Sequence, residues 1–193
     1  MKGLLLIGLI HLFLTGGCLK TNTIETNSPF PNAIVAAPTP TEKINEYNAF
    51  VINSVVLSSL RHNYIFGNTV VDELDAGDLL VYRNETIAPR GLEQVKGEPG
   101  ISSELIANFV DANNKQNDLE KDYHILDSTI SRSGPNDARI FFSIEKAQYP
   151  KTKAVAMLSN IGIDLEKRLA LVYVEYFGEI RGFQRFYLLL ELE

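Results

Sequence analysis

The sequence has few of the residues on which several common activities depend. It contains no tryptophan, one cysteine and three histidines in 193 residues. A single thiol excludes an internal disulfide and any zinc site built from several cysteines. The 18 Lys and Arg residues face 24 Asp and Glu residues, for a formal net charge of −6. This balance argues against nucleic acid as a partner, because binding to phosphates depends on Lys and Arg.

Catalytic and cofactor-binding signatures are absent from the sequence. It has no Gly-x-Ser-x-Gly, P-loop, His-Glu-x-x-His or dinucleotide-binding glycine pattern. We therefore assign no catalytic, cofactor-binding or metal-ligating residue and expect no cofactor. The alternative is a small extracytoplasmic hydrolase that uses His124, with partners taken from Asp122, Asp127, Ser128 and Ser159. The spacing does not select that set, because a catalytic triad is defined by its arrangement in space.

The first seventeen residues have the pattern of an export signal. Lys2 supplies a short basic start, and Leu4 to Leu14 form a nearly unbroken apolar run of eleven residues. This length suits the apolar region of a secretory signal and falls short of the ~20 residues that a membrane-spanning helix needs. We therefore predict a signal peptide over residues 1–17.

The residues from Leu14 to Cys18 read Leu-Thr-Gly-Gly-Cys and resemble a bacterial lipobox. The resemblance implies cleavage immediately before Cys18, diacylglycerol on its thiol and usually an acyl chain, such as palmitate, on the new amine. Lipoboxes prefer leucine three residues before the cysteine, whereas this chain has Thr15 there and Leu14 one residue further back. Two alternatives remain: a conventional cleaved signal with an incidental cysteine, and a retained, poorly anchored helix.

Lipid on Cys18 would place the protein in the bacterial cell envelope, in contact with a membrane through its N-terminus. Each buried CH₂ of an acyl chain contributes about 0.8 kcal/mol, so two or three chains give stable anchoring. Leu19 stands where some Gram-negative lipoproteins carry an Asp that retains them in the inner membrane. An outer-membrane location is therefore expected if the cell is Gram-negative.

Residues 18–40 are predicted to be a flexible tether. They are rich in Thr, Asn and Pro, a composition that buries too little apolar surface to fold. As a flexible coil the tether would span on the order of 25 Å. Any order within residues 1–17 is expected to carry no information about the mature protein.

Residues 41–193 are predicted to form a single globular α+β domain with about three helices. In each helix apolar residues recur at helical spacing, and Ser102 or Ser103 provides an N-cap for the second. The predicted helices cover about residues 42–60, 103–113 and 137–148. The third is expected to pack through an apolar stripe made of Ile140, Phe141, Ile144 and Ala147.

The last quarter of the chain, from Lys153 to Glu193, has three apolar runs separated by two polar breaks that contain glycine. This pattern is typical of an antiparallel meander, and we expect a sheet of three or four strands. The middle run, Leu169 to Phe177, is apolar at alternating positions on both faces. Such a strand needs cover on both sides, which the helices would supply. Leu79 to Ile87 is a further predicted strand.

Four acidic residues are clustered between Asp72 and Asp78. Hard cations such as calcium bind to several oxygen ligands, so a calcium loop is one interpretation. The spacing does not match the EF-hand pattern and lacks its bidentate glutamate. We therefore predict a solvated turn without a metal.

The C-terminal half contains a series of short motifs at Tyr149-Pro150, Leu158–Ile163, Ala170–Val174, Gly178, Gly182 and Tyr187–Glu191. This series resembles the pattern of an uncharacterised family of bacterial exported proteins and lipoproteins. Members of that family have a helix that ends in Tyr-Pro, a Leu-Ser-x-Val-Gly-Phe strand, an Ala-Leu-Val-Tyr-Val strand, a hairpin with glycine and a final Leu-Leu-Glu strand. The resemblance implies an exported α+β protein, and it brings no activity, substrate or catalytic residue.

The hairpin between Gly178 and Arg185 is the surface segment best suited to contact a partner. Arg181, Phe183 and Arg185 form a predicted contact patch, because Arg and aromatic residues are enriched at interfaces. The alternative is a solvated loop with Phe183 folded back. Together these features predict a lipid-anchored envelope protein that acts as a non-catalytic binding or structural module, with an unknown protein as its partner.

Overall fold

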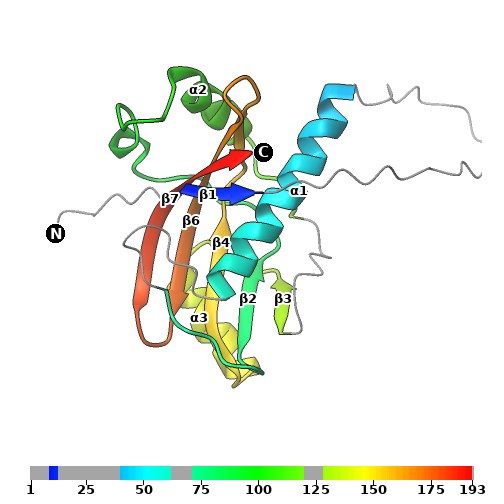
Figure 1. The fold of residues 1–193 in the computed structure, drawn as a ribbon. Coiled ribbons are helices and arrows are strands. Elements are labelled where there is room, and N and C mark those ends of the chain that lie inside the picture. The colour runs from blue at the N-terminus through cyan, green and yellow to red at the C-terminus, as the bar shows by residue number, and fades with distance from the viewer. Residues whose placement is uncertain (1–8, 13–39, 62–70, 120–127, 193) are drawn as a thin grey trace, which may run out of the picture.

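The computed structural model describes residues 9–12, 40–61, 71–119 and 128–192, with side chains described between residues 51 and 191 of these ranges. Three α-helices lie beside one sheet in this part of the chain (Figure 1). The helices are α1 (Pro40–Arg61), α2 (Ser103–Ala112) and α3 (Ala138–Gln148), and a short 3₁₀ helix, η1 (Leu92–Gln94), precedes α2. The strands are β1 (Leu9–Leu12), β2 (Leu79–Arg83), β3 (Thr129–Arg132), β4 (Thr152–Leu158), β5 (Gly162–Asp164), β6 (Leu169–Gly178) and β7 (Gly182–Leu192).

The sheet confirms the α+β class but is larger than predicted and mixed. Its order is β1-β7-β6-β4-β2-β3, and β5 pairs with β6 beyond the end of β4. The antiparallel pairs β4–β6 and β6–β7 match the predicted meander. The prediction of a purely antiparallel sheet is wrong, because β2 pairs in parallel with both β3 and β4. Helical crossovers through α2 and α3 separate these strands, and such crossovers bring a chain back in the same direction.

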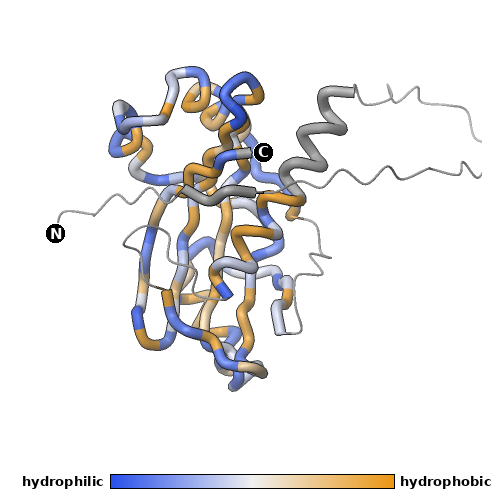
Figure 2. Tube along the Cα trace, in the orientation of Figure 1, coloured by the Kyte–Doolittle hydropathy of each residue, from blue (hydrophilic) through white to orange (hydrophobic). Residues whose placement is uncertain are grey.

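β6 is buried on both faces, as its alternating apolar sequence predicts. Ala170, Val172 and Val174 belong to the core cluster that includes the C-terminal half of α1. Leu171 and Tyr173 belong to a second cluster, built with α2 and α3 on the opposite face. Figure 2 shows the apolar colour along the central strands and along the part of α1 next to them. The helices therefore supply the cover that a strand with two apolar faces requires.

The third helix packs through a different face from the one predicted. Phe141 is buried against the sheet, but Ile140 is 54% exposed and Ile144 is 42% exposed. Ala138 and Glu145 are the other buried residues of α3. The predicted stripe is therefore right for Phe141 and wrong for its other members, Ile140, Ile144 and Ala147. The residues that face inward beside Phe141 are Ala138, three positions before it, and Glu145, four positions after it.

β1 lies within the segment that the sequence predicts to be a signal peptide. It pairs in parallel with the end of β7, with Leu9 opposite Leu189 and Leu12 opposite Leu192. It forms one edge of the sheet, so the other strands pair with one another without it. Its removal would leave the remaining strand order intact.

Asp72 fastens the tip of the β6–β7 hairpin, although the sequence predicts a solvated turn there. Asp72 is 3% exposed. Its carboxylate accepts hydrogen bonds from the backbone N–H groups of Ile180 (2.7 Å) and Arg181 (2.8 Å). A Cβ at Gly178 would lie 2.5 Å from the Asp72 carboxyl carbon, so this approach requires glycine. The prediction is therefore wrong for Asp72, and no group of three or more potential metal ligands occurs among the described residues.

Replacing Asp72 tests this clamp. Asp72→Ala should lower the free energy of unfolding by about 2 kcal/mol or more, because hydrogen bonds to a charged group each contribute ~1.5–3 kcal/mol. Asp75→Ala is the matched control, since Asp75 is an exposed acid of the same cluster. Urea unfolding of the two variants gives the comparison, and equal losses for both would contradict the clamp.

The buried carboxylate of α3 makes stability depend on pH. Glu145 is 3% exposed, and its Oε2 atom has no hydrogen-bond partner in the structure. Burial raises the pKa of Glu145, and attraction to Arg132 opposes that rise only in part. The native state therefore holds this proton more tightly than the unfolded chain does. The contribution of Glu145 to stability is full below the unfolded pKa of ~4.3 and is lost as pH rises through the native pKa.

Glu145→Gln removes this titration while it keeps the shape of the side chain. We expect the variant to melt at a higher temperature than the wild type at pH 7 and at nearly the same temperature at pH 3.5. Glu73→Gln is the control, because Glu73 is exposed. Thermal melts at both pH values measure the difference. A Glu145→Gln variant that is less stable than the wild type at pH 7 would show that the charged form is favoured in the fold.

Candidate functional site

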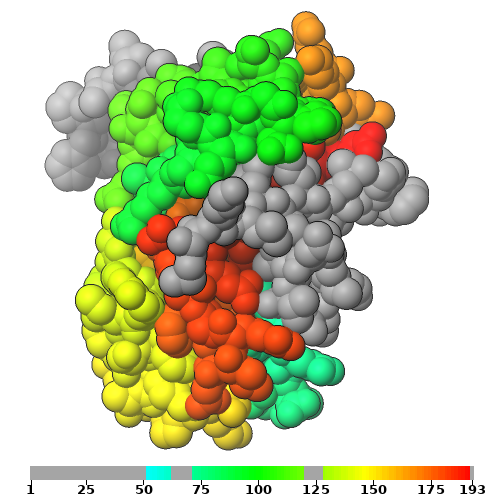
Figure 3. All heavy atoms as spheres, turned by 90° about the vertical axis from the view of Figure 1, so that its left-hand side faces the viewer, coloured from blue at the N-terminus to red at the C-terminus, as the bar shows by residue number. Residues whose placement is uncertain are grey.

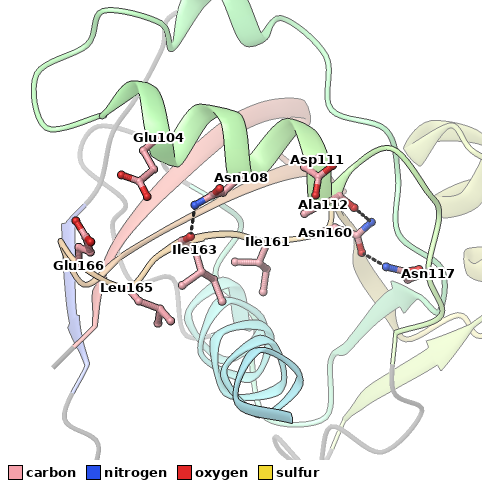
Figure 4. Close-up of a pocket in the computed structure, with 10 residues that line it drawn as sticks. All are labelled: Glu104, Asn108, Asp111, Ala112, Asn117, Asn160, Ile161, Ile163, Leu165 and Glu166. Atoms are coloured by element: carbon pink, nitrogen blue, oxygen red, sulfur yellow. Dashed lines mark hydrogen bonds between the residues drawn. The ribbon is translucent and has the colours of Figure 1, made fainter. Parts of the chain in front are cut away.

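A hollow of about 600 Å³ opens between α2 and the segment from the end of β4 to the start of β6 (Figure 4). Its described lining combines acidic, amide and apolar side chains. They are Glu104, Asn108, Asp111, Ala112, Asn117, Asn160, Ile161, Ile163, Leu165 and Glu166. Gly162 allows the backbones to come close beneath this hollow, because a Cβ there would lie 2.4 Å from the Cα of Phe109.

Asn160 joins the wall after β4 to the loop after α2. Its Nδ2 atom donates to the carbonyl oxygens of Ala112 (2.9 Å) and Lys115 (2.7 Å). Its Oδ1 atom accepts from Asn117 Nδ2 (3.0 Å), and its backbone N–H donates to Asn113 Oδ1 (3.0 Å). These hydrogen bonds join the end of β4 to a loop that is more than forty residues away in the sequence. A hydrogen-bond network therefore fixes the shape of the hollow.

The hydroxyl of Ser159 forms hydrogen bonds with backbone groups. It accepts a hydrogen bond from the Tyr173 N–H (2.9 Å) and donates to the Asn160 carbonyl (2.7 Å). Ser159 was one of the two hydroxyls proposed for a hydrolase that uses His124. His124 and both of its candidate carboxylates lie outside the described residues. For Ser159 the observed role is to join β4 to β6.

The rim of the hollow is acidic and its floor is apolar. Glu104 comes from α2 and Glu166 from the turn between β5 and β6, and Figure 4 shows both at the same end of the opening. Ile161 and Ile163 pack against the α1 side of the core, and Leu165 is 51% exposed. The arrangement offers hydrogen-bond acceptors above an apolar surface, which suits a ligand that donates hydrogen bonds.

The predicted contact patch is partly assembled in the structure. The guanidinium carbon of Arg185 lies 4.6 Å from the ring centroid of Phe183, and that of Arg139 lies 5.7 Å from the same centroid. Phe183 is partly buried and packs against the α2–α3 side of the core. Arg181 lies in the hairpin turn, where its backbone N–H donates to Asp72. The structure therefore joins Phe183 to Arg185 and adds Arg139, which sequence reasoning missed.

Glu175 lies directly opposite Arg185 on the neighbouring strand and was also missed. Its side chain is 2% exposed, and its Oε1 atom lies 3.3 Å from Arg185 Nε and 3.7 Å from Arg90 Nε. The hydroxyl of Tyr173 donates to the same oxygen (2.8 Å). Burial and the neighbouring Glu175 carboxylate raise the pKa of Tyr173, so the hydroxyl stays protonated as a donor. One sequence signal was available: Glu175 is the single charged residue between Leu169 and Phe177.

Comparison of the chain with protein-family models, with curated proteins and with solved structures found no match. The likeness to a family of exported proteins therefore stays a prediction. None of the described helices combines the length and the apolar character that crossing a membrane requires.

Replacing Asn160 tests whether the amide network shapes the hollow. Asn160→Ala removes three side-chain hydrogen bonds and should lower the free energy of unfolding by about 1–3 kcal/mol. Asn114→Ala is the control, because the exposed Asn114 side chain makes one long bond (3.4 Å) to Asp111 in the same region. Urea unfolding measures both variants, and a loss no larger than the control's would exclude a structural role for the network.

Proposed function

We propose that this chain is a lipid-anchored protein of the bacterial cell envelope whose folded body is a non-catalytic binding or structural module. The observation that carries the proposal is the apolar run from Leu4 to Leu14 followed closely by Cys18. Cys18 lies outside the described residues, so the support comes from the sequence. The single cysteine of the chain stands where a lipobox would place it.

A lipid anchor at Cys18 followed by a flexible tether would explain why the N-terminal segment is polar and rich in proline after Cys18. Two or three acyl chains on Cys18 would hold the protein at a bilayer, at ~0.8 kcal/mol for each buried CH₂. The polar and Pro-containing residues up to 40 would then separate the lipid from the body by on the order of 25 Å. Leu19, in place of an Asp, favours the outer membrane in a Gram-negative cell.

Cleavage before Cys18 would remove β1 from the mature protein. The backbone of β7 between Leu189 and Leu192 would then lose its parallel neighbour, while β7 would keep its full pairing with β6. The described members of the core clusters on both faces of β6 lie between Ile52 and Leu190. Cleavage would therefore leave these described members of the core in the mature protein.

A binding role for the body is supported by two surface features. One is the acidic hollow beside α2, and the other is the group of arginines around Phe183 and Glu175. The hydrolase alternative depends on His124, and the hydroxyl of Ser159 is already engaged with the backbone. We therefore favour binding over catalysis.

The anchor is tested by replacing the cysteine. In the wild type, mass spectrometry should find a mature N-terminus at Cys18 that carries the added mass of acyl chains. Cys18→Ala should lack this mass, and most of the protein should leave the membrane fraction. Ser28→Ala, a change within the tether, is the control and should behave as the wild type.

Two results would overturn the anchor. One is a mature N-terminus with an unmodified cysteine or with no cysteine. The other is a Cys18→Ala variant that remains in the membrane fraction as firmly as the wild type.

A further inference from the structure

We propose that Arg90 and Arg185 form a binding site for an oxyanion of the phosphate class, positioned by the buried carboxylate of Glu175. The proposal deepens the binding role given above and rests on it, but it does not depend on lipid at Cys18. Both arginines approach the Oε1 atom of Glu175 through Nε, at 3.7 Å and 3.3 Å.

Contact through Nε leaves the Nη atoms of both guanidinium groups without a partner among the described residues. Within the described part of the chain, neither Arg90 nor Arg185 makes a hydrogen bond through its Nη atoms to another described residue. Their side chains are 51% and 44% exposed, so the charged ends reach solvent. A guanidinium with two free N–H groups on one edge binds phosphate or carboxylate oxygens in a bidentate manner.

Glu175 is a positioning residue in this arrangement. A carboxylate that is 2% exposed is stable only with charged and hydrogen-bonding partners, and the two arginines and Tyr173 supply them. The Tyr187 hydroxyl also donates to the backbone carbonyl of Arg90 (3.1 Å), which holds the Arg90 loop against the sheet. Side chains fixed in this way lose little further freedom when a ligand binds.

The local charge favours an anion although the whole chain is acidic. Arg90 and Arg185 together exceed Glu175 by one positive charge. Arg139, whose guanidinium carbon lies 5.7 Å from the ring centroid of Phe183, is neutralised by Asp137, with Nη2 and Oδ2 3.0 Å apart. Phe183 stacks on Arg185 and limits the directions in which its guanidinium can point.

Three separate elements meet at this surface. Arg90 precedes η1, Arg185 is on β7, and α3 brings Arg139 beside them. Figure 3 shows β7 in red on one face of the molecule, with α3 in yellow beside it and the green segment that leads to α2 above it. The site is therefore a product of the fold, because no short stretch of sequence contains it.

Two sources could supply the oxyanion: free phosphate, and the phosphate of an anionic lipid headgroup. For the first, inorganic phosphate would be titrated into the full chain in a non-ionic detergent. Calorimetry and the Nε–Hε NMR signals of the arginines would report binding. We expect the signals of Arg90 and Arg185 to shift saturably, and we expect the affinity to fall about tenfold or more in Arg185→Gln and in Arg90→Gln.

Arg181→Gln is the matched control, since Arg181 is an exposed arginine of the same hairpin that contacts Asp72 only through its backbone. It should bind phosphate as the wild type does. Circular dichroism of each variant shows that the fold is intact. Because Arg90 and Arg185 lie on different elements, a folding defect in one variant leaves the other as the test.

For the lipid source, co-sedimentation would compare vesicles of phosphatidylcholine with vesicles that also contain phosphatidylglycerol, using the full chain with Cys18→Ala. A preference for phosphatidylglycerol that Arg185→Gln removes would identify a lipid phosphate as the ligand. Phosphate binding without that preference would identify a free phosphate. The proposal fails if neither probe responds to the Arg90 and Arg185 substitutions, or if Arg181→Gln gives an equal loss. Those results leave the lipid anchor standing, because mass spectrometry tests it separately.

Discussion

The structure depends on one constraint: β6 has no face that can meet water. Nine of its ten residues are apolar or glycine, and the apolar ones alternate between two core clusters. Burying both faces requires layers on both sides, so α1 covers one and α2 with α3 covers the other. The single charged residue of the strand, Glu175, must then be paired within the fold, and Arg185, Arg90 and Tyr173 supply its partners. Its pairing with Arg185, directly opposite on β7, follows from the same constraint.

Local patterns predicted the elements well and their arrangement less well. The alternation of β6, the meander and the cap at Ser102 could be predicted because each depends on neighbouring residues. The parallel pairing of β2 with β3 and β4 joins residues that are far apart in the sequence, and no local signal encodes it. The inward face of α3 was mispredicted because Glu145 lies where periodicity favours an apolar residue.

The same distinction applies to the surface sites. Phe183 and Arg185 are two residues apart on a strand and therefore share a face, so their association could be predicted. Arg90 and Arg139 reach the same place from a loop and a helix, which only the fold reveals. The hollow beside α2 depends on Asn160, whose amide binds carbonyls more than forty positions earlier. Amide side chains in a loop give no sequence signal for such a role.

The contact between Asp72 and the β6–β7 hairpin also limits when the protein can finish folding. The residues that it joins are 108 positions apart in the case of Asp72 and Ile180. Contacts of such long range form slowly, because a large loop must close before they contribute any stability. During synthesis the hairpin emerges more than a hundred residues after Asp72, so the Asp72 carboxylate has no partner until that length of chain has followed it.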